Sequence, residues 1–200
     1  MSIYKQVLGD EFNQLHSMLQ KRYALMSTKP VTGKGVMLDI KGAPWFLKPM
    51  MKLLTKRKLL FPEQGSQVPF MINNTPRSNG KQIYWERAFY FPHQTRYFNA
   101  LMSLDEERLV IKDYLGEPPL MYSDLVFSVE DGALLIRSLK QRLVIGSIEV
   151  PLPKWFQGVA TVKEDYHDEK EKFGISVQVN NPILGQLFHY KGEFTSEDLT

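Results

Sequence analysis

The chain has 200 residues, of which 43% are hydrophobic and 24% charged, and its formal net charge is +3. These values are typical of a globular protein with a buried core, whereas a disordered chain has fewer apolar residues and more net charge. There is no cysteine, which excludes disulfide scaffolds, thiolate zinc sites, iron–sulfur clusters and cysteine nucleophiles. We therefore expect a single domain over residues 1–200.

The sequence shows no signal peptide at its N-terminus and no membrane-spanning segment. The N-terminus lacks the long apolar stretch of a signal peptide, and no segment approaches the roughly 20 apolar residues that span a bilayer. We expect a cytoplasmic protein with no transmembrane segment. The charge is uneven, because residues 1–62 hold 11 Lys/Arg and 3 Asp/Glu while residues 163–200 hold 4 and 8. A basic N-terminal third favours an anionic partner, or the two ends complement each other in the folded molecule.

Residues 1–62 are expected to be mainly helical. Gly9 and Asp10 divide the first 25 residues into a short turn and a longer helix with Asp10 as its N-cap. The apolar residues there are spaced by four, three and four, so that they share one helical face: Leu8, Phe12, Leu15 and Leu19.

A second helix is expected within residues 45–61. It should begin near Leu47 or Lys48, because Pro49 fits only in a first turn, and end at Pro62. One side is apolar and is made of Phe46, Leu47, Met50, Leu53 and Leu54. Lysines follow the other side at a spacing of four: Lys48, Lys52 and Lys56. This pattern suits a membrane surface or a lid over a pocket, and it is equally typical of a helix that covers a sheet.

From Val68 onward the apolar pattern has the period of two that strands show. A hairpin is expected from residues 84–91, a turn at Pro92-His93-Gln94, and a return over residues 96–103. Asp131-Gly132 predicts a tight turn, and Gly146 and Gly158 indicate bulges or close approaches. Further strands are expected at residues 106–113, 123–130, 133–140, 142–149, 158–167, 172–180 and 187–195.

Many short-linked strands imply an antiparallel meander, which must curl or close to hide its edges. The expected fold is therefore α+β and β-rich. It is a strongly curved antiparallel sheet or barrel-like meander over residues 63–200, with two N-terminal helices packed against it.

Several phrases along the chain resemble a bacterial family known only as domain of unknown function 4166. They are Ile3-Tyr4, Val7-Leu8-Gly9, Leu60-Phe61-Pro62, Val68-Pro69-Phe70, Trp85-Glu86-Arg87-Ala88-Phe89-Tyr90-Phe91-Pro92, Arg96-Tyr97-Phe98, Met102, Asp113-Tyr114-Leu115-Gly116 and the stretch from Asn181 to Phe194. Family members occur alone or fused to saccharopine-dehydrogenase-like domains, and this chain resembles the stand-alone form. Where many members have a Gly-Thr-Met-Trp-like phrase near the first strand, this chain has Gly33-Lys34-Gly35-Val36-Met37. The family has no established activity, so the resemblance does not indicate a function.

Motifs for catalysis, metal ions or cofactors are missing from the sequence. The four histidines, His16, His93, His167 and His189, have no metal-ligand spacing. There is no Gly-x-Ser-x-Gly elbow, Walker loop or Rossmann fingerprint. We expect no metal and no cofactor, and the lack of such motifs favours a protein that is not an enzyme.

The strand at residues 84–91 and its partner provide the best polar candidates. Arg87 shares a core-like face with Trp85 and Phe89, and a buried guanidinium must find an acceptor. Arg87 and Arg96 either hold an anionic group inside the barrel or pair with carboxylates such as Asp113 and Glu86. The candidate ligand-binding residues are Trp85, Arg87, Phe89, Arg96 and Arg137. Lys48, Lys52 and Lys56 are the candidate lid or membrane contacts.

The sequence is compatible with three functions. The first is non-catalytic binding of a lipid or other hydrophobic molecule in a cavity of the curved sheet. The second is an enzyme or accessory domain acting in the same pocket through Glu86, Asp113, His189 and Tyr190. The third is a protein-interaction module. Nucleic acid is not expected as a partner, since the lysines lie mostly on one helix and no stacking platform is evident.

Overall fold

The computed structural model describes residues 2–199 of the chain. Its helices are α1 (Ile3–Leu8), η1 (Gly9–Gln14), α2 (Ser17–Leu25), η2 (Trp45–Leu47), α3 (Lys48–Lys56), η3 (Ser78–Gly80), η4 (Lys154–Phe156), η5 (Asp168–Lys170) and η6 (Glu197–Leu199), where η marks a 3₁₀ helix. Its strands are β1 (Val31–Lys41), β2 (Val68–Arg77), β3 (Gln82–Phe91), β4 (Gln94–Tyr97), β5 (Ala100–Asp105), β6 (Val110–Leu115), β7 (Met121–Glu130), β8 (Ala133–Ile145), β9 (Ile148–Pro151), β10 (Val159–His167), β11 (Lys172–Asn181) and β12 (Gly185–Thr195).

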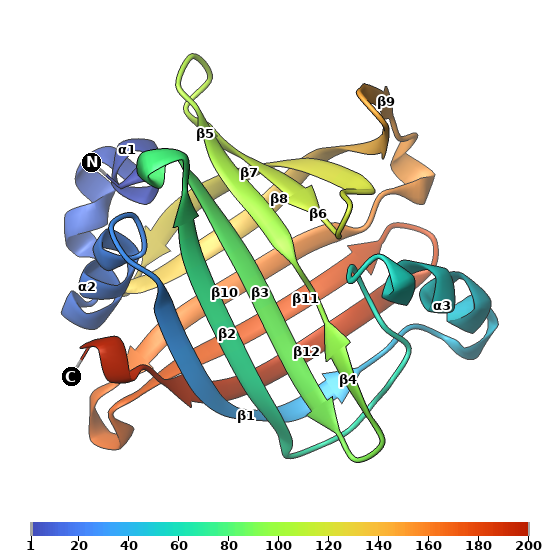
Figure 1. The fold of residues 1–200 in the computed structure, drawn as a ribbon, viewed down its shortest axis with the longest axis horizontal. Coiled ribbons are helices and arrows are strands. Elements are labelled where there is room, and N and C mark those ends of the chain that lie inside the picture. Colours follow the sequence, from blue (N-terminus) through green and yellow to red (C-terminus); the bar gives the residue numbers. More distant parts are fainter. Residues whose placement is uncertain (1, 200) are drawn as a thin grey trace.

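The sheet is a closed antiparallel barrel, as Figure 1 shows. Within residues 2–199, ten strands follow one another in the order β10-β11-β12-β1-β2-β3-β5-β6-β7-β8, and β8 pairs again with β10 to close the ring. The short strands β4 and β9 extend the wall beside β3 and β8. The expectation of a curved antiparallel sheet or barrel with N-terminal helices packed against it is confirmed.

The first helices cover one end of the barrel, together with the C-terminal helix η6 (Figure 1). All four residues expected on the apolar face, Leu8, Phe12, Leu15 and Leu19, are buried. The expected N-cap at Asp10 was wrong, because residues 9–14 form the 3₁₀ helix η1 and the chain breaks again before α2 begins at Ser17. The α-helix that follows is capped by His16, whose Nδ1 accepts a hydrogen bond from the Met18 N–H at 3.3 Å.

Helix α3 lies at the opposite end of the barrel and is shorter than expected. It begins at Lys48 with Pro49 in its first turn, which confirms the expected start. It ends at Lys56 rather than at Pro62, because Lys58 takes a left-handed conformation with a φ of 51°. The chain then turns back, and the Lys58 carbonyl accepts a hydrogen bond from the Asn99 N–H at 2.8 Å.

Most of the expected strands are present, with four corrections. The return expected over residues 96–103 is divided into β4 and β5, with a break at Phe98 and Asn99. β1 lies inside the part expected to be helical, and it joins β2 to β12. The break expected between strands at residues 133–140 and 142–149 is absent. Instead, β8 runs on to Ile145, and the chain turns at Gly146 into β9. The strand expected at residues 106–113 begins only at Val110, after a turn. The tight turn at Asp131-Gly132 is confirmed, with φ values of 49° and 77°.

The half of the barrel beneath α2 is filled by side chains around a buried charge. Arg22 reaches from α2 into the barrel, where its Nη1 lies 2.7 Å from Glu164 Oε1 and its Nη2 donates to Asn74 Oδ1 at 2.8 Å. The Tyr23 hydroxyl donates to the other oxygen of Glu164 at 2.9 Å. Burial raises the pKa of Glu164, and Arg22 opposes that effect. This end of the barrel is therefore closed by a paired polar cluster set among aromatic rings.

Candidate functional site

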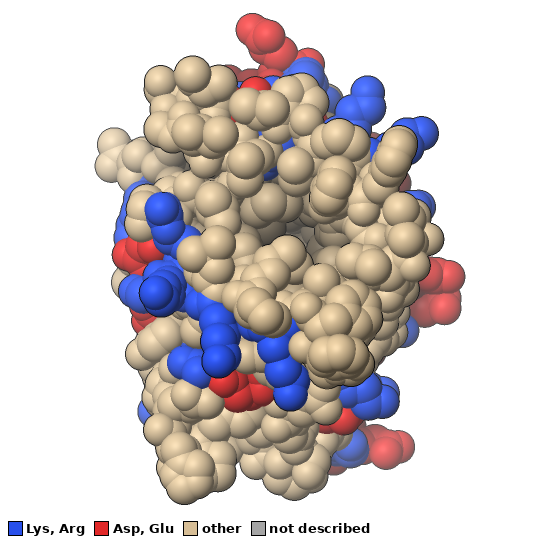
Figure 2. Space-filling model, turned by 90° about the vertical axis from the view of Figure 1, so that its right-hand side faces the viewer, with Lys and Arg blue, Asp and Glu red and all other residues tan. Residues whose placement is uncertain are grey.

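A cavity of about 200 Å³ occupies the other half of the barrel, between the closed end and α3. Its lining is mainly aliphatic and methionine side chains from the barrel wall, with Met50, Met51 and Leu54 of α3 and Phe156 of η4 at its entrance. Figure 2 looks onto this end of the molecule and shows the surface hollowed near its centre. The barrel thus has one filled end and one open end, which we call the mouth.

Arg87 lies at the inner part of the cavity on β3. Its side chain is 6% exposed, and its Nε donates a hydrogen bond to the Phe98 carbonyl at 2.8 Å. The guanidinium lies over the Phe98 ring, 3.9 Å from the ring centroid, an arrangement that suits a planar cation. Burial raises the pKa of Tyr190, and the charge of Arg87 opposes that effect. The interpretation of Arg87 as a core-facing residue holds, and the residue lines the cavity.

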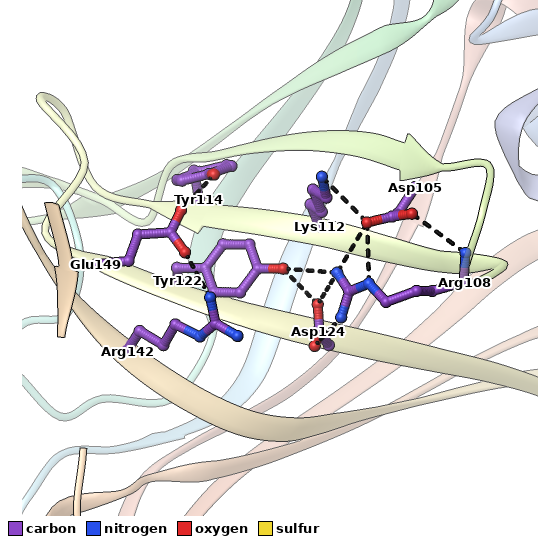
Figure 3. A network of polar contacts seen from close by, with 8 residues as sticks. All are labelled: Asp105, Arg108, Lys112, Tyr114, Tyr122, Asp124, Arg142 and Glu149. Atoms are coloured by element: carbon purple, nitrogen blue, oxygen red, sulfur yellow. Dashed lines mark hydrogen bonds and ion pairs between the residues drawn. The ribbon is translucent and has the colours of Figure 1, made fainter. Parts of the chain in front are cut away.

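Asp113 is the acidic side chain of the same cavity. Its neighbours on β6, Lys112 and Tyr114, point to the outer face, where each joins the network of Figure 3. Every carboxylate of that outer network has partners: Asp105 and Asp124 bind Arg108, and Glu149 binds Arg142. Asp113 instead points inward and is 5% exposed.

The Asp113 carboxyl has an unusual electrostatic environment. Burial raises its pKa to about 7, although the positive charge of Arg87 acts in the opposite direction. Among residues 2–199, no donor lies within hydrogen-bonding reach of its buried Oδ1 atom. Most buried polar atoms in proteins have a partner, because an unpaired one costs the free energy of its lost hydration. The carboxyl therefore has unmet hydrogen-bonding capacity at the wall of the cavity.

The other polar side chains of the cavity are used by the barrel itself. The ladder between β8 and β10 stops at the Arg137–Thr161 pair. Beyond it, Ser138 Oγ accepts a hydrogen bond from the Ala160 N–H at 2.8 Å. Gln141 then exchanges two hydrogen bonds with the backbone of Gly158, at 2.7 and 2.8 Å. These side chains hold the seam of the barrel, which leaves Arg87 and Asp113 as the charged residues of the cavity lining.

The other proposed ligand-binding residues lie elsewhere. Arg96 makes two hydrogen bonds to the Glu63 carboxylate, at 2.7 and 2.9 Å, away from the cavity. Trp85 belongs to the closed end, where its Nε1 donates to the Tyr4 hydroxyl at 2.8 Å. Phe89 packs among aromatic rings of the core, and Arg137 is exposed on the outer wall. Of that set, the structure brings Arg87 alone to the cavity wall among the residues it describes.

The four side chains considered for catalysis are divided between the two faces of the wall. Asp113 and Tyr190 are buried inside the barrel. Glu86 alternates with the inward Trp85 and Arg87 and so lies on the outer face, and His189 lies outside beside Asp39, with 3.6 Å between His189 Nε2 and Asp39 Oδ2. The four groups therefore do not meet at one substrate.

The mouth carries apolar side chains that the sequence pattern did not single out. Trp155 and Phe156 of η4 project from it, and Asn181 ties the turn between β11 and β12 to this segment through hydrogen bonds to the Trp155 and Gln157 carbonyls, at 2.7 and 2.8 Å. Ile183 and Leu184 lie exposed in that turn. The closure of β8 onto β10 places η4 beside the cavity, and this closure leaves no signal in the local sequence.

Helix α3 has a wider apolar face than the barrel covers. Met51 is fully buried, and Leu47 and Leu54 pack against the core. Phe46, Met50 and Leu53, which the sequence placed on the same side, are exposed at the mouth. Lys48, Lys52 and Lys56 are also exposed there. None of the helices within residues 2–199 has the length and apolar character needed to cross a bilayer.

Comparisons with known proteins agree with the resemblance found in the sequence. The family model described as "Domain of unknown function (DUF4166)" matches residues 15–194. The chain belongs to this family. It is also 39% identical, over 201 aligned positions, to "Uncharacterized protein YndH" of Bacillus subtilis (strain 168), and the match covers 98% of each chain.

Proposed function

We propose that this protein binds a hydrophobic small molecule of the lipid class in the cavity of its barrel, with Arg87 and Asp113 holding the polar group of that molecule. The observation that carries the proposal is that Asp113 and Arg87 both line the cavity, and that the buried Oδ1 of Asp113 has no hydrogen-bond partner among residues 2–199. Apolar pockets with a few convergent polar groups are typical of small-molecule sites.

The size of the cavity limits the part of the ligand that it encloses. A cavity of about 150 Å³ holds one benzene molecule. The 200 Å³ found here therefore accommodates one ring or a short chain segment with its polar group. A longer acyl chain fits only if the rest of it leaves through the mouth, along Phe156 and Met50.

The two polar groups favour a ligand with acceptor oxygens. Arg87 is a donor at any pH that the protein encounters. Asp113 with a pKa of about 7 holds its proton below neutral pH and is then a donor as well. A carboxylate or carbonyl oxygen placed between them accepts from both, and fatty acids are the simplest lipids that carry such a group.

Native mass spectrometry of the purified protein, followed by organic extraction, tests the proposal. We expect a bound mass that is released by organic solvent and has the chemistry of a fatty acid or a similar amphiphile. The stripped protein should then rebind one equivalent of added fatty acid, and Arg87→Leu should lower that affinity about tenfold or more, as expected when a charged hydrogen bond is lost. A protein that purifies without a ligand and binds no member of a fatty-acid series contradicts the proposal.

A further inference from the structure

We propose that the mouth of the barrel docks on the surface of an anionic lipid bilayer. The docking surface consists of exposed apolar side chains on three segments around the mouth, flanked by lysines. It goes beyond the proposed ligand binding, because a barrel can hold a ligand without contacting a membrane and can contact a membrane without holding a ligand.

The apolar part of this surface is formed by projecting side chains. They belong to η2 and α3, to η4, and to the turn between β11 and β12, and each is between 60% and 79% exposed: Trp45, Leu53, Trp155, Phe156 and Ile183. Trp45 packs edge-on against Phe46, which is itself half exposed. Exposed large side chains that are scattered singly need no explanation, whereas a group of them around one opening indicates an interaction surface.

The charged part of this surface is basic. Lys58, just beyond α3, pairs with Glu117 at 2.7 Å. By contrast, Lys48, Lys52 and Lys56 form no ion pair with the residues that the structure describes. Lys154 lies exposed directly before Trp155 on η4. Figure 2 shows lysine and arginine side chains gathered along one side of the hollow, next to the uncharged rim.

A bilayer is the partner that fits both parts. Tryptophan and other apolar side chains that project from a rim insert into the interfacial region of a membrane, while lysines beside them meet anionic head groups. The same arrangement places the cavity entrance, at Phe156 and Met50, against the membrane surface. An amphiphile could then pass between bilayer and cavity without crossing water.

Co-sedimentation with lipid vesicles tests the docking surface. We expect the protein to bind vesicles in which about a third of the phosphatidylcholine is replaced by phosphatidylglycerol, and to bind pure phosphatidylcholine vesicles at least tenfold more weakly. The double variant Lys48→Glu/Lys52→Glu should lose about tenfold or more of the binding to anionic vesicles, since each basic residue near such a surface contributes measurably. Trp155→Ser/Phe156→Ser should lose binding to a similar extent. All four side chains are exposed, so both variants should fold, and circular dichroism checks this.

The control carries the same change of charge at the closed end. Lys21 of α2 and Lys29 are exposed there, and Lys21→Glu/Lys29→Glu should leave vesicle binding within about twofold of the wild type. Equal losses in the two lysine variants would show non-specific attraction and overturn the proposal. Absence of wild-type binding to anionic vesicles would also overturn it and would favour a protein partner for this surface. A variant with a filled cavity, Ala160→Phe, should still bind vesicles, which separates this proposal from ligand binding.

Discussion

Arg22 of α2 and Glu164 of β10 form an ion pair inside the barrel, with 2.7 Å between Arg22 Nη1 and Glu164 Oε1 and side chains that are 0% and 1% exposed. The pair joins a helix near the N-terminus to a strand 142 residues later in the chain. It lies inside the closed end of the barrel, and neither residue belongs to the cavity lining.

Removing one member of this pair should destabilise the fold. Glu164→Gln leaves the Arg22 charge buried without its counter-ion, and we expect the free energy of unfolding to fall by about 3 kcal/mol or more. Urea unfolding followed by circular dichroism measures this. Lys170→Ala is the matched control, because its pair with Glu193 lies at the surface, and the expected loss is about 1 kcal/mol or less. Equal losses in the two variants would contradict a structural role for the buried pair.

The carboxyl of Asp113 should make the stability of the protein depend on pH. Its pKa is about 7 in the folded protein and about 3.9 in an unfolded chain, so the folded state keeps a proton that the unfolded state releases between these values. Stability from this group is therefore present below about pH 4 and is lost as the pH rises through 7. Asp113→Asn removes this dependence. We expect the free energy of unfolding of the variant, relative to that of the wild type, to increase by a few kcal/mol from about pH 5 to pH 8. Urea unfolding at the two pH values decides this, and a constant difference between wild type and variant would show that Asp113 is already ionised at the lower pH.

The same group should control the affinity for a fatty acid. As the pH rises through 7, Asp113 loses the proton that it donates and acquires a charge that repels the ligand carboxylate. We expect the affinity of the wild type to fall over this range and that of Asp113→Asn to change little. Binding titrations at several pH values measure both proteins. A decline of equal size in the variant would assign the pH dependence to another group.

Gly35 of β1 should not tolerate a side chain. A Cβ atom there would lie 2.0 Å from the Glu193 carbonyl oxygen on β12, so that the two strands would have to separate. We expect Gly35→Ala to lose about 3 kcal/mol or more, or not to fold. Gly146 offers a control, because a Cβ there meets no atom within 4 Å, although its φ of 62° costs about 1 to 2 kcal/mol for any other residue. Thermal unfolding compares the two, and a Gly35→Ala protein as stable as Gly146→Ala would contradict the close approach.

The β-rich fold could be predicted because alternation and turn residues are local signals. The exception is β1, where Gly33 and Gly35 occupy inward positions beside Phe194 and the backbone of β12. Their lack of side chains is what lets the strands approach, and it also removes the apolar alternation by which a strand is recognised. β8 is longer than the sequence predicts for a related reason, since its buried positions include the polar residues Ser138 and Gln141, which interrupt the apolar alternation.

The candidate site could be predicted only in part. The shared face of Trp85 and Arg87 follows from strand periodicity, and Arg87 does line the cavity. The pairing of Arg96 with Glu63 depends on the contact between β4 and the loop before β2, and the position of Asp113 in the cavity wall depends on how the barrel closes. That closure joins segments far apart in the chain, and no local pattern encodes it.

Binding of a fluorescent polyene fatty acid to two variants of neighbouring residues on β10 tests the cavity most directly. Ala160 lines the cavity, and Thr161 is exposed on the outer face. We predict that the wild type and Thr161→Phe bind one equivalent of the probe with the same affinity, and that Ala160→Phe binds at least about tenfold more weakly because its ring occupies the 200 Å³ cavity. Equal binding by Ala160→Phe and Thr161→Phe, with both proteins folded, would contradict a ligand site inside the barrel.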